Sequence, residues 1–279
     1  MYKNILAAVN EYSNSEIAAR YALALAKSCH AKLTLLFVSR DPVDKDAIKK
    51  AESAIERLFI EAQQGGIEAE SLILKGDPVK KIIEHAIEQG TDIVFAASRH
   101  VDVHRRFFVR TVARELMLKL PCASAVVRVT RMGKIAPRNI LLPLRGGRAF
   151  VEERAYFTVR LAEGFGSRVT LLHLPKPITS FFQGELHLKP AQREQRIPAD
   201  VLELAAYLKT SGIPYEITTA SGAAASSITM EAVKKRTDLI IMGASQRSLL
   251  ASIIKGNPVE EVMKSPPCNL IIFKPRRAS

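Results

Sequence analysis

The sequence predicts an α/β protein with two doubly wound, Rossmann-like domains, each a five-stranded parallel sheet flanked by helices. Three observations support this fold class. The chain has 279 residues, more than the roughly 100–200 of one domain, so each half is long enough to bury its own core. Segments of the first half recur in the second. Short apolar runs alternate with amphipathic segments, and right-handed connections would place helices on both faces of each sheet.

The internal duplication defines the two domains. YKNILAAVN at residues 2–10 aligns with PRNILLPLR at 137–145, an offset of 135 (Ile140 minus Ile5). TDIVFAAS aligns with TDLIIMGA at an offset of 146 (Thr237 minus Thr91), so the second copy has gained about eleven residues. We therefore predict domains over residues 1–132 and 133–279, with an inserted loop near 175–198 that prolines interrupt.

Within the first half, five apolar runs are short enough to be buried parallel strands. They cover residues 4–9, 33–38, 70–74, 93–97 and 124–129. The segments between them repeat apolar residues at helical spacing. We expect Ser13 or Asn14 to cap the first helix, and Gly65 with Gly66 to end the second. In the second half, Pro258 suits the first turn of a helix.

Composition limits the classes of function. The net charge of +13 is compatible with an anionic partner, but it is spread along the chain without the aromatic pattern of an RNA-binding sheet or a helix-turn-helix, so nucleic acid is disfavoured. No apolar run reaches the ~18 residues of a membrane span, and the N-terminus does not resemble a signal peptide. We expect a cytoplasmic protein whose three cysteines, Cys29, Cys122 and Cys268, are reduced and buried.

Topology indicates where a ligand would bind. In doubly wound sheets, ligands lie beyond the carboxyl ends of the strands, where the strand order reverses. This rule selects the loops after the first and fourth strands of each half. In this sequence they begin at Asn10 and Ala97 in the first half, and at Arg145 and Gly243 in the second.

With these features in view, the chain resembles a tandem universal stress protein over nearly its whole length. The blocks that carry the resemblance are NILAAVN, NILLPLR, GDPVKKIIEHA, and TDLIIMGAS through IIKGNPVEEVMKSPPCNLIIF. It implies a stress-response protein with adenine nucleotide alpha hydrolase-like domains packed as a pseudo-dimer. The fifth strands of the two domains, at 124–129 and 270–273, would pair across the junction and so protect their edges.

The resemblance also implies a nucleotide site that has degenerated. ATP-binding members carry an Asp at the end of the first strand, beside the adenine, and a motif of Gly, two residues, Gly, nine residues, Gly, then Ser or Thr. Glycines let backbone N–H groups approach phosphates, and the last positions open a helix that favours anions. In the second half these positions are Gly243, Gln246, Gly256, Asn257 and, for the Asp, Arg145.

Two glycines therefore keep their spacing in the second half, and Asn257 can still cap a helix. In the first half the equivalents are Ala97, His100, Arg110 and Thr111, and the strand ends in Asn10. We expect the first half not to bind ATP in the family's manner. The second half is expected to keep an anion site at most, with ATP or another adenine nucleotide as its candidate cofactor.

The loop at residues 99–114 is rich in arginine, which binds phosphate through two parallel hydrogen bonds. Its candidate anion-binding residues are Arg99, His100, Arg105, Arg106 and Arg110. The alternative is a solvated surface that pairs with acidic residues. The HVDVH segment in this loop has no further ligands at metal-site spacing, so no metal site is predicted.

No motif for nucleophilic or phosphoryl-transfer catalysis is present, since the sequence contains no G-x-S-x-G, Walker A or G-x-G-x-x-G fingerprint in a strand-turn-helix setting. We expect a non-catalytic module that binds an unidentified small molecule or protein and can pair into a higher homo-oligomer. Two alternatives stay open: an ATP-binding switch with slow hydrolysis in the second half, and an anion or nucleic-acid binder acting through residues 99–114.

Overall fold

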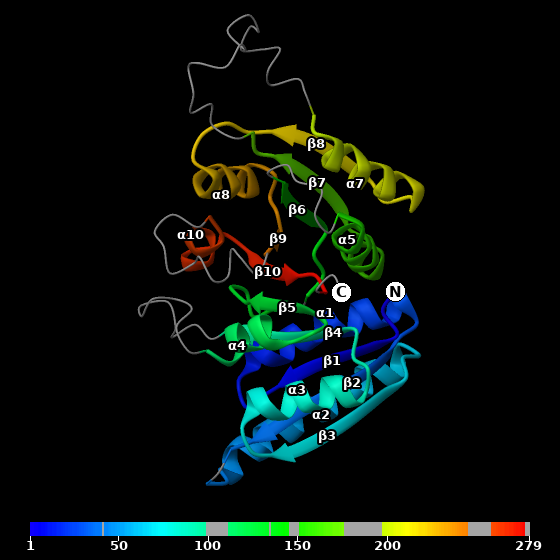
Figure 1. The fold of residues 1–279 in the computed structure, drawn as a ribbon, viewed down its shortest axis with the longest axis vertical. Coiled ribbons are helices and arrows are strands. Elements are labelled where there is room, and N and C mark those ends of the chain that lie inside the picture. The colour runs from blue at the N-terminus through cyan, green and yellow to red at the C-terminus, as the bar shows by residue number, and fades with distance from the viewer. Residues whose placement is uncertain are drawn as a thin grey trace, which may run out of the picture.

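A computed structural model describes residues 1–40, 42–98, 111–133, 135–144, 151–175, 197–244 and 258–276 of the chain. Its strands form one ten-stranded sheet in the order β3-β2-β1-β4-β5-β10-β9-β6-β7-β8. The first half of the chain supplies one end of the sheet and the second half the other, so the molecule is elongated along the strand order (Figure 1).

Each half alternates strands and helices in the same way. The first half contains β1 (Asn4–Val9), α1 (Ser13–Cys29), β2 (Lys32–Ser39), α2 (Lys45–Gln64), β3 (Ala69–Lys75), α3 (Pro78–Glu88), β4 (Ile93–Ser98), α4 (Val112–Lys119) and β5 (Ala123–Arg128). The second half contains β6 (Asn139–Leu144), α5 (Val151–Phe165), β7 (Arg168–His173), α7 (Ala199–Thr210), β8 (Tyr215–Thr219), α8 (Ala224–Lys234), β9 (Leu239–Gly243), α10 (Pro258–Lys264) and β10 (Asn269–Lys274).

The predicted fold class is confirmed. Within each half the five strands are parallel, and the first-half strands lie within one residue of the predicted runs. Gly65 is the C-cap of α2 and Gly66 follows with a left-handed φ of 68°, as predicted for the end of that helix. Pro258 is the first residue of α10, also as predicted.

The cap predicted for the first helix is wrong. Tyr12 occupies the N-cap of α1 and makes no side-chain cap hydrogen bond, while Ser13 and Asn14 already belong to the helix. The hydroxyl of Ser15 instead donates to the carbonyl oxygens of Tyr12 at 2.8 Å and Asn10 at 3.1 Å. These bonds hold the loop after β1 against the start of α1, which replaces the usual capping geometry.

The molecule has two apolar cores, one on each face of the sheet, whereas the sequence had suggested one core for each half of the chain. One core lies under α1, α2, α5 and α7, and includes Leu25 and Phe157, both fully buried. The other lies under α3, α4, α8 and α10, and includes Met117 and Met263. Because each core takes side chains from both halves, the halves share their apolar burial.

Antiparallel pairing of β5 with β10 joins the two halves. Leu270 pairs with Arg128, Ile272 with Val126, and the ladder continues to the end of β10. The pairing expected of the two fifth strands is therefore confirmed. A free edge here would expose unpaired backbone N–H and C=O groups, so the pairing also protects both strands.

Helices α1 and α5 cross over this junction at unusually close range. A Cβ on Gly164 of α5 would lie 2.6 Å from the carbonyl oxygen of Ala24 in α1. Next to this contact, the ring of Tyr21 packs edge-on against Phe165 with centroids 5.6 Å apart. Tyr21 also accepts a 3.0 Å hydrogen bond from Nδ2 of Asn269, which ties α1 of one half to β10 of the other.

The close approach predicts that Gly164→Ala destabilises the chain. Alanine gains up to about 1 kcal/mol of helix propensity, but the methyl group must push α1 and α5 apart, and overpacking costs about 1–3 kcal/mol. We expect a net loss in the free energy of unfolding, measured with urea. Gly133→Ala is the control, because a Cβ there meets nothing within 4 Å. Equal stability of the two variants would contradict the packing described.

Candidate functional site

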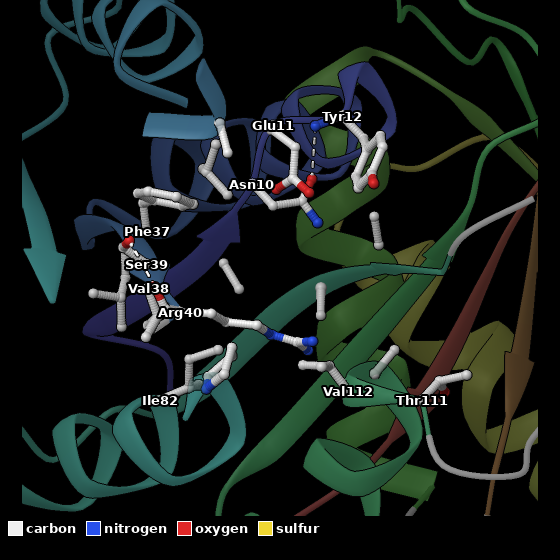
Figure 2. A pocket seen from close by; sticks show the side chains of 18 of the residues that line it. Asn10, Glu11, Tyr12, Phe37, Val38, Ser39, Arg40, Ile82, Thr111 and Val112 are labelled. Atoms are coloured by element: carbon white, nitrogen blue, oxygen red, sulfur yellow. Dashed lines mark hydrogen bonds between the residues drawn. The ribbon is translucent and has the colours of Figure 1, made fainter. Parts of the chain in front are cut away.

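A pocket of about 250 Å³ opens at the carboxyl end of the first-half strands. Figure 2 shows it between the ends of β1 and β2, the start of α4 and the side of α3. Residues 8–12, 36–40, 96–98 and 111–113 line it, together with Pro42, Asp44, Ala47, Pro78 and Ile82. The pocket lies where β1 is flanked by β2 on one side and β4 on the other. The connections that follow β1 and β4 run to opposite sides of this point, which leaves a crevice between them.

Asn10 follows β1 and has a fixed side-chain orientation. Its amide oxygen Oδ1 accepts a 3.0 Å hydrogen bond from the backbone N–H of Tyr12, and its own backbone N–H donates to Ser15 Oγ at 2.9 Å. With the oxygen engaged in this local turn, the amide nitrogen Nδ2 is turned toward the space that Arg40 enters from the other side (Figure 2). The site therefore presents an N–H donor at this position.

Buried polar atoms without partners lie at the end of β4. Nδ2 of Asn14 donates to the carbonyl oxygen of Ser98 at 2.8 Å. Oδ1 of Asn14 and Oγ of Ser98 are buried and have no hydrogen-bond partner in the part of the chain that the structure describes. Ser98 lines the pocket and its side chain is 8% exposed. An unpaired buried polar atom costs about 1–3 kcal/mol, so a ligand that bonds to the Ser98 hydroxyl would recover part of that cost.

A cationic side chain is among the residues that line the pocket. Arg40 follows β2, and within the described part of the chain its guanidinium makes no hydrogen bond or ion pair. Figure 2 shows it extended toward Val112 and Thr111 at the start of α4. Thr111 caps that helix by accepting from the backbone N–H of Arg114 at 3.3 Å. A free guanidinium beside a helix N-terminus favours a ligand with an anionic group.

Most of the residues predicted for the second-half site lie outside the described residues. They are Arg145, Gln246, Gly256 and Asn257. The five candidate anion-binding residues of the arginine loop also lie outside them: Arg99, His100, Arg105, Arg106 and Arg110. Arg114, predicted to end that loop, lies in α4 and is 8% exposed, so it is not part of a solvated surface. Gly243 is the predicted second-half site residue whose surroundings the structure gives.

Gly243 ends β9 and lies against Arg154 of α5. A Cβ on Gly243 would come 3.3 Å from Nη1 of Arg154, so a larger residue would displace this guanidinium. Nε of Arg154 is buried without a partner, and its charge interacts with that of Asp200 at the start of α7. Sequence reasoning missed Arg154, although a charged residue three positions from both Val151 and Phe157 on the apolar stripe of the helix was a usable signal.

The first-half site was also only partly accessible from sequence. The topological rule selected Asn10 and Ala97, and both line the pocket. Ser98 is the last residue of β4, next to Ala97, and Arg40 follows β2, a strand that the rule did not select. No local motif marks either side chain as a ligand group. Their convergence depends on strand order, which only the folded sheet supplies.

The described residues offer little for nucleophilic or metal chemistry. Burial raises the pKa of Cys122 to about 11 and that of Cys268 to about 12, and it also raises the pKa of Cys29. All three thiols are free; Cys122 and Cys268 are buried as predicted, whereas Cys29 is only half-buried. Among the residues with described positions, no group of three or more His, Cys, Asp or Glu side chains could hold a metal ion.

The family model of the universal stress protein family matches the chain twice, over residues 1–128 and 138–274. The chain belongs to this family. The double match also shows that the duplication seen in the sequence is a tandem pair of family units.

Relatives of known sequence correspond to one unit each. The chain is 24% identical over 152 residues to a universal stress protein of Bacillus subtilis, which covers 46% of this chain and all of that protein. It is 30% identical over 141 residues to one of Staphylococcus haemolyticus, covering 46% of this chain and 85% of the relative.

A solved universal stress protein from Archaeoglobus fulgidus matches the whole architecture. The TM-score is 0.65 at 16% identity, with 98% of this chain and 96% of the other covered. At this identity the likeness establishes the fold alone. In the described parts of this universal stress protein, no helix is both long and apolar enough to cross a membrane.

The raised thiol pKa values predict slow alkylation in the native state. At pH 7.5 we expect iodoacetamide to modify Cys29, which is half-buried, slowly and to leave Cys122 and Cys268 unmodified until urea unfolds the chain. Peptide mass spectrometry of native and unfolded samples measures this. Rapid native modification of Cys268 would contradict the burial of that thiol.

Proposed function

We propose that this universal stress protein is a cytoplasmic, non-catalytic stress-response module that binds a small ligand in the pocket of its first half. The ligand carries an anionic group. Occupancy of the pocket would signal to a partner protein, and the chain would not turn the ligand over.

The unpaired polar groups of the pocket carry this proposal. Among the described residues, the buried Ser98 hydroxyl and the Arg40 guanidinium have no hydrogen-bond or ion-pair partner, and the Asn10 amide nitrogen is aimed inward. Buried polar groups such as the Ser98 hydroxyl are normally satisfied, and a small set of polar groups over apolar walls is typical of a ligand site. Apolar walls come from Val38 and Ile82, among others.

We also propose the second-half loop as a separate nucleotide or anion site. The Gly243 to Gly256 spacing supports it, as does the guanidinium of Arg154 beside Gly243. In this site Gln246, Asn257 and Arg145 would replace the groups that ATP-binding members use. ATP with slow hydrolysis is the enzymatic alternative for this half.

Native mass spectrometry of freshly purified protein tests the first-half proposal without knowledge of the ligand. We expect a mass excess equal to one small molecule per chain. Ala97→Leu should abolish it, because the added carbons fill the pocket that Ala97 lines. Ala206→Leu, on an exposed position of α7, should retain the excess and serves as the control for the added apolar volume.

Each result has a defined meaning. Ala97→Leu protein that folds normally in urea titrations and keeps the bound mass would contradict a ligand in this pocket. A separate thermal-shift assay with Mg-ATP addresses the second half. Stabilisation that survives Ala97→Leu, together with release of phosphate, would favour the ATP switch over the non-catalytic module.

A further inference from the structure

We infer that the first-half pocket selects a ligand with a lactam edge, in which a ring carbonyl lies next to a ring N–H, as in a 6-oxopurine. The inference rests on the proposed function, because it specifies the chemistry of the ligand in that same pocket. It excludes adenine as the preferred base, because adenine presents the opposite order of donor and acceptor.

The donor side of this selection is Asn10. At many asparagines the amide nitrogen and oxygen could exchange places by a half-turn of the side chain. Here such a turn would bring Nδ2 against the Tyr12 N–H and would lose the 3.0 Å hydrogen bond to Oδ1. The local turn therefore keeps Nδ2 facing the pocket, and a ligand atom that approaches it must be an acceptor.

The acceptor side is Glu11, the next residue along the loop. Its carboxylate lines the same pocket and makes no hydrogen bond or ion pair within the described residues. The charge of Glu11 contributes to the raised pKa of Lys50 in α2. Lys50 itself pairs with Asp46, with Nζ 2.8 Å from Oδ2. Because an ionised carboxylate only accepts hydrogen bonds, the ligand group facing Glu11 must be a donor.

Asn10 and Glu11 are neighbours in the chain and both line the pocket, so they can present a donor beside an acceptor, to which a lactam is the complement. The apolar walls of Val38, Ile82 and Ala97 suit the faces of a flat ring. The volume of 250 Å³ lies just below the roughly 300–1,000 Å³ of pockets that enclose larger ligands, so it suits a base whose sugar extends outward. The guanidinium of Arg40 extends toward Val112 across the pocket from Asn10 (Figure 2).

Inosine and adenosine provide a matched pair of probes, because they differ only in this edge of the base. In adenosine the amino group, a donor, would face the donor Nδ2 of Asn10. The unprotonated ring nitrogen, an acceptor, would face the carboxylate of Glu11, so neither contact could form a hydrogen bond. We expect inosine to bind at least about tenfold more tightly in isothermal titration calorimetry, since unpaired polar groups in a binding site are penalised strongly.

Asn10→Asp isolates the donor. The new carboxylate can still accept from the Tyr12 N–H, so the turn is kept, while the inward N–H donor becomes an acceptor. The ratio of inosine to adenosine affinity should fall at least about tenfold. Gln64→Glu makes the same change of amide to carboxylate at an exposed position of α2, and it should leave the ratio unchanged.

Three outcomes are distinguishable. Preference for inosine that is lost in Asn10→Asp alone supports the inference. Equal or tighter binding of adenosine by the unmodified chain overturns it, while ligand binding in this pocket stands. If neither nucleoside binds, the inference is again overturned, and the bound mass in the Ala97→Leu experiment decides the proposed function independently.

Discussion

The antiparallel ladder between β5 and β10 joins two parallel five-stranded sheets into one. Its backbone hydrogen bonds satisfy groups that would otherwise form open edges in the middle of the molecule. The ladder also brings α1 onto α5, where Gly164 allows contact with Ala24 and Asn269 bonds to Tyr21. Since both apolar cores continue across this line, separating the halves would expose the two cores together.

The reversal of direction at the junction determines where the carboxyl ends of the strands lie in each half. First-half strands are parallel to β5 and second-half strands to β10, so their carboxyl ends face opposite edges of the sheet. The pocket at Asn10 and Gly243 at the end of β9 therefore lie at opposite edges of the sheet. This separation allows the halves to diverge, and the residues at equivalent positions, Asn10 and Arg145, differ in charge and hydrogen bonding.

Local patterns in the sequence were sufficient for the strands, since apolar runs such as 4–9 and 93–97 correspond to β1 and β4. They were insufficient for the first helix cap, because the Ser15 hydroxyl bonds to a loop whose course depends on β1. The division of burial by face was also beyond local patterns. It follows from strand order across both halves, to which no segment contributes alone.

Local sequence patterns were also insufficient to predict the chemistry of the candidate site. Topology located Asn10 and Ala97 correctly at a crevice, but the features that suggest ligand chemistry are the unpaired Ser98 hydroxyl and the Arg40 guanidinium. Both depend on which atoms lack partners after folding. The family's glycine motif favours a ligand site in the second half. The side-chain geometry of the pocket favours one in the first half as strongly.

The most direct test of this account is the location of ligand binding, observed by amide NMR during titration with inosine. The account predicts chemical-shift changes that cluster at Asn10, Ser39 and Ser98 around the first-half pocket, and no changes near Gly243 or α10. Changes that cluster at Gly243 and α10, with the Asn10 region unaffected, would contradict it.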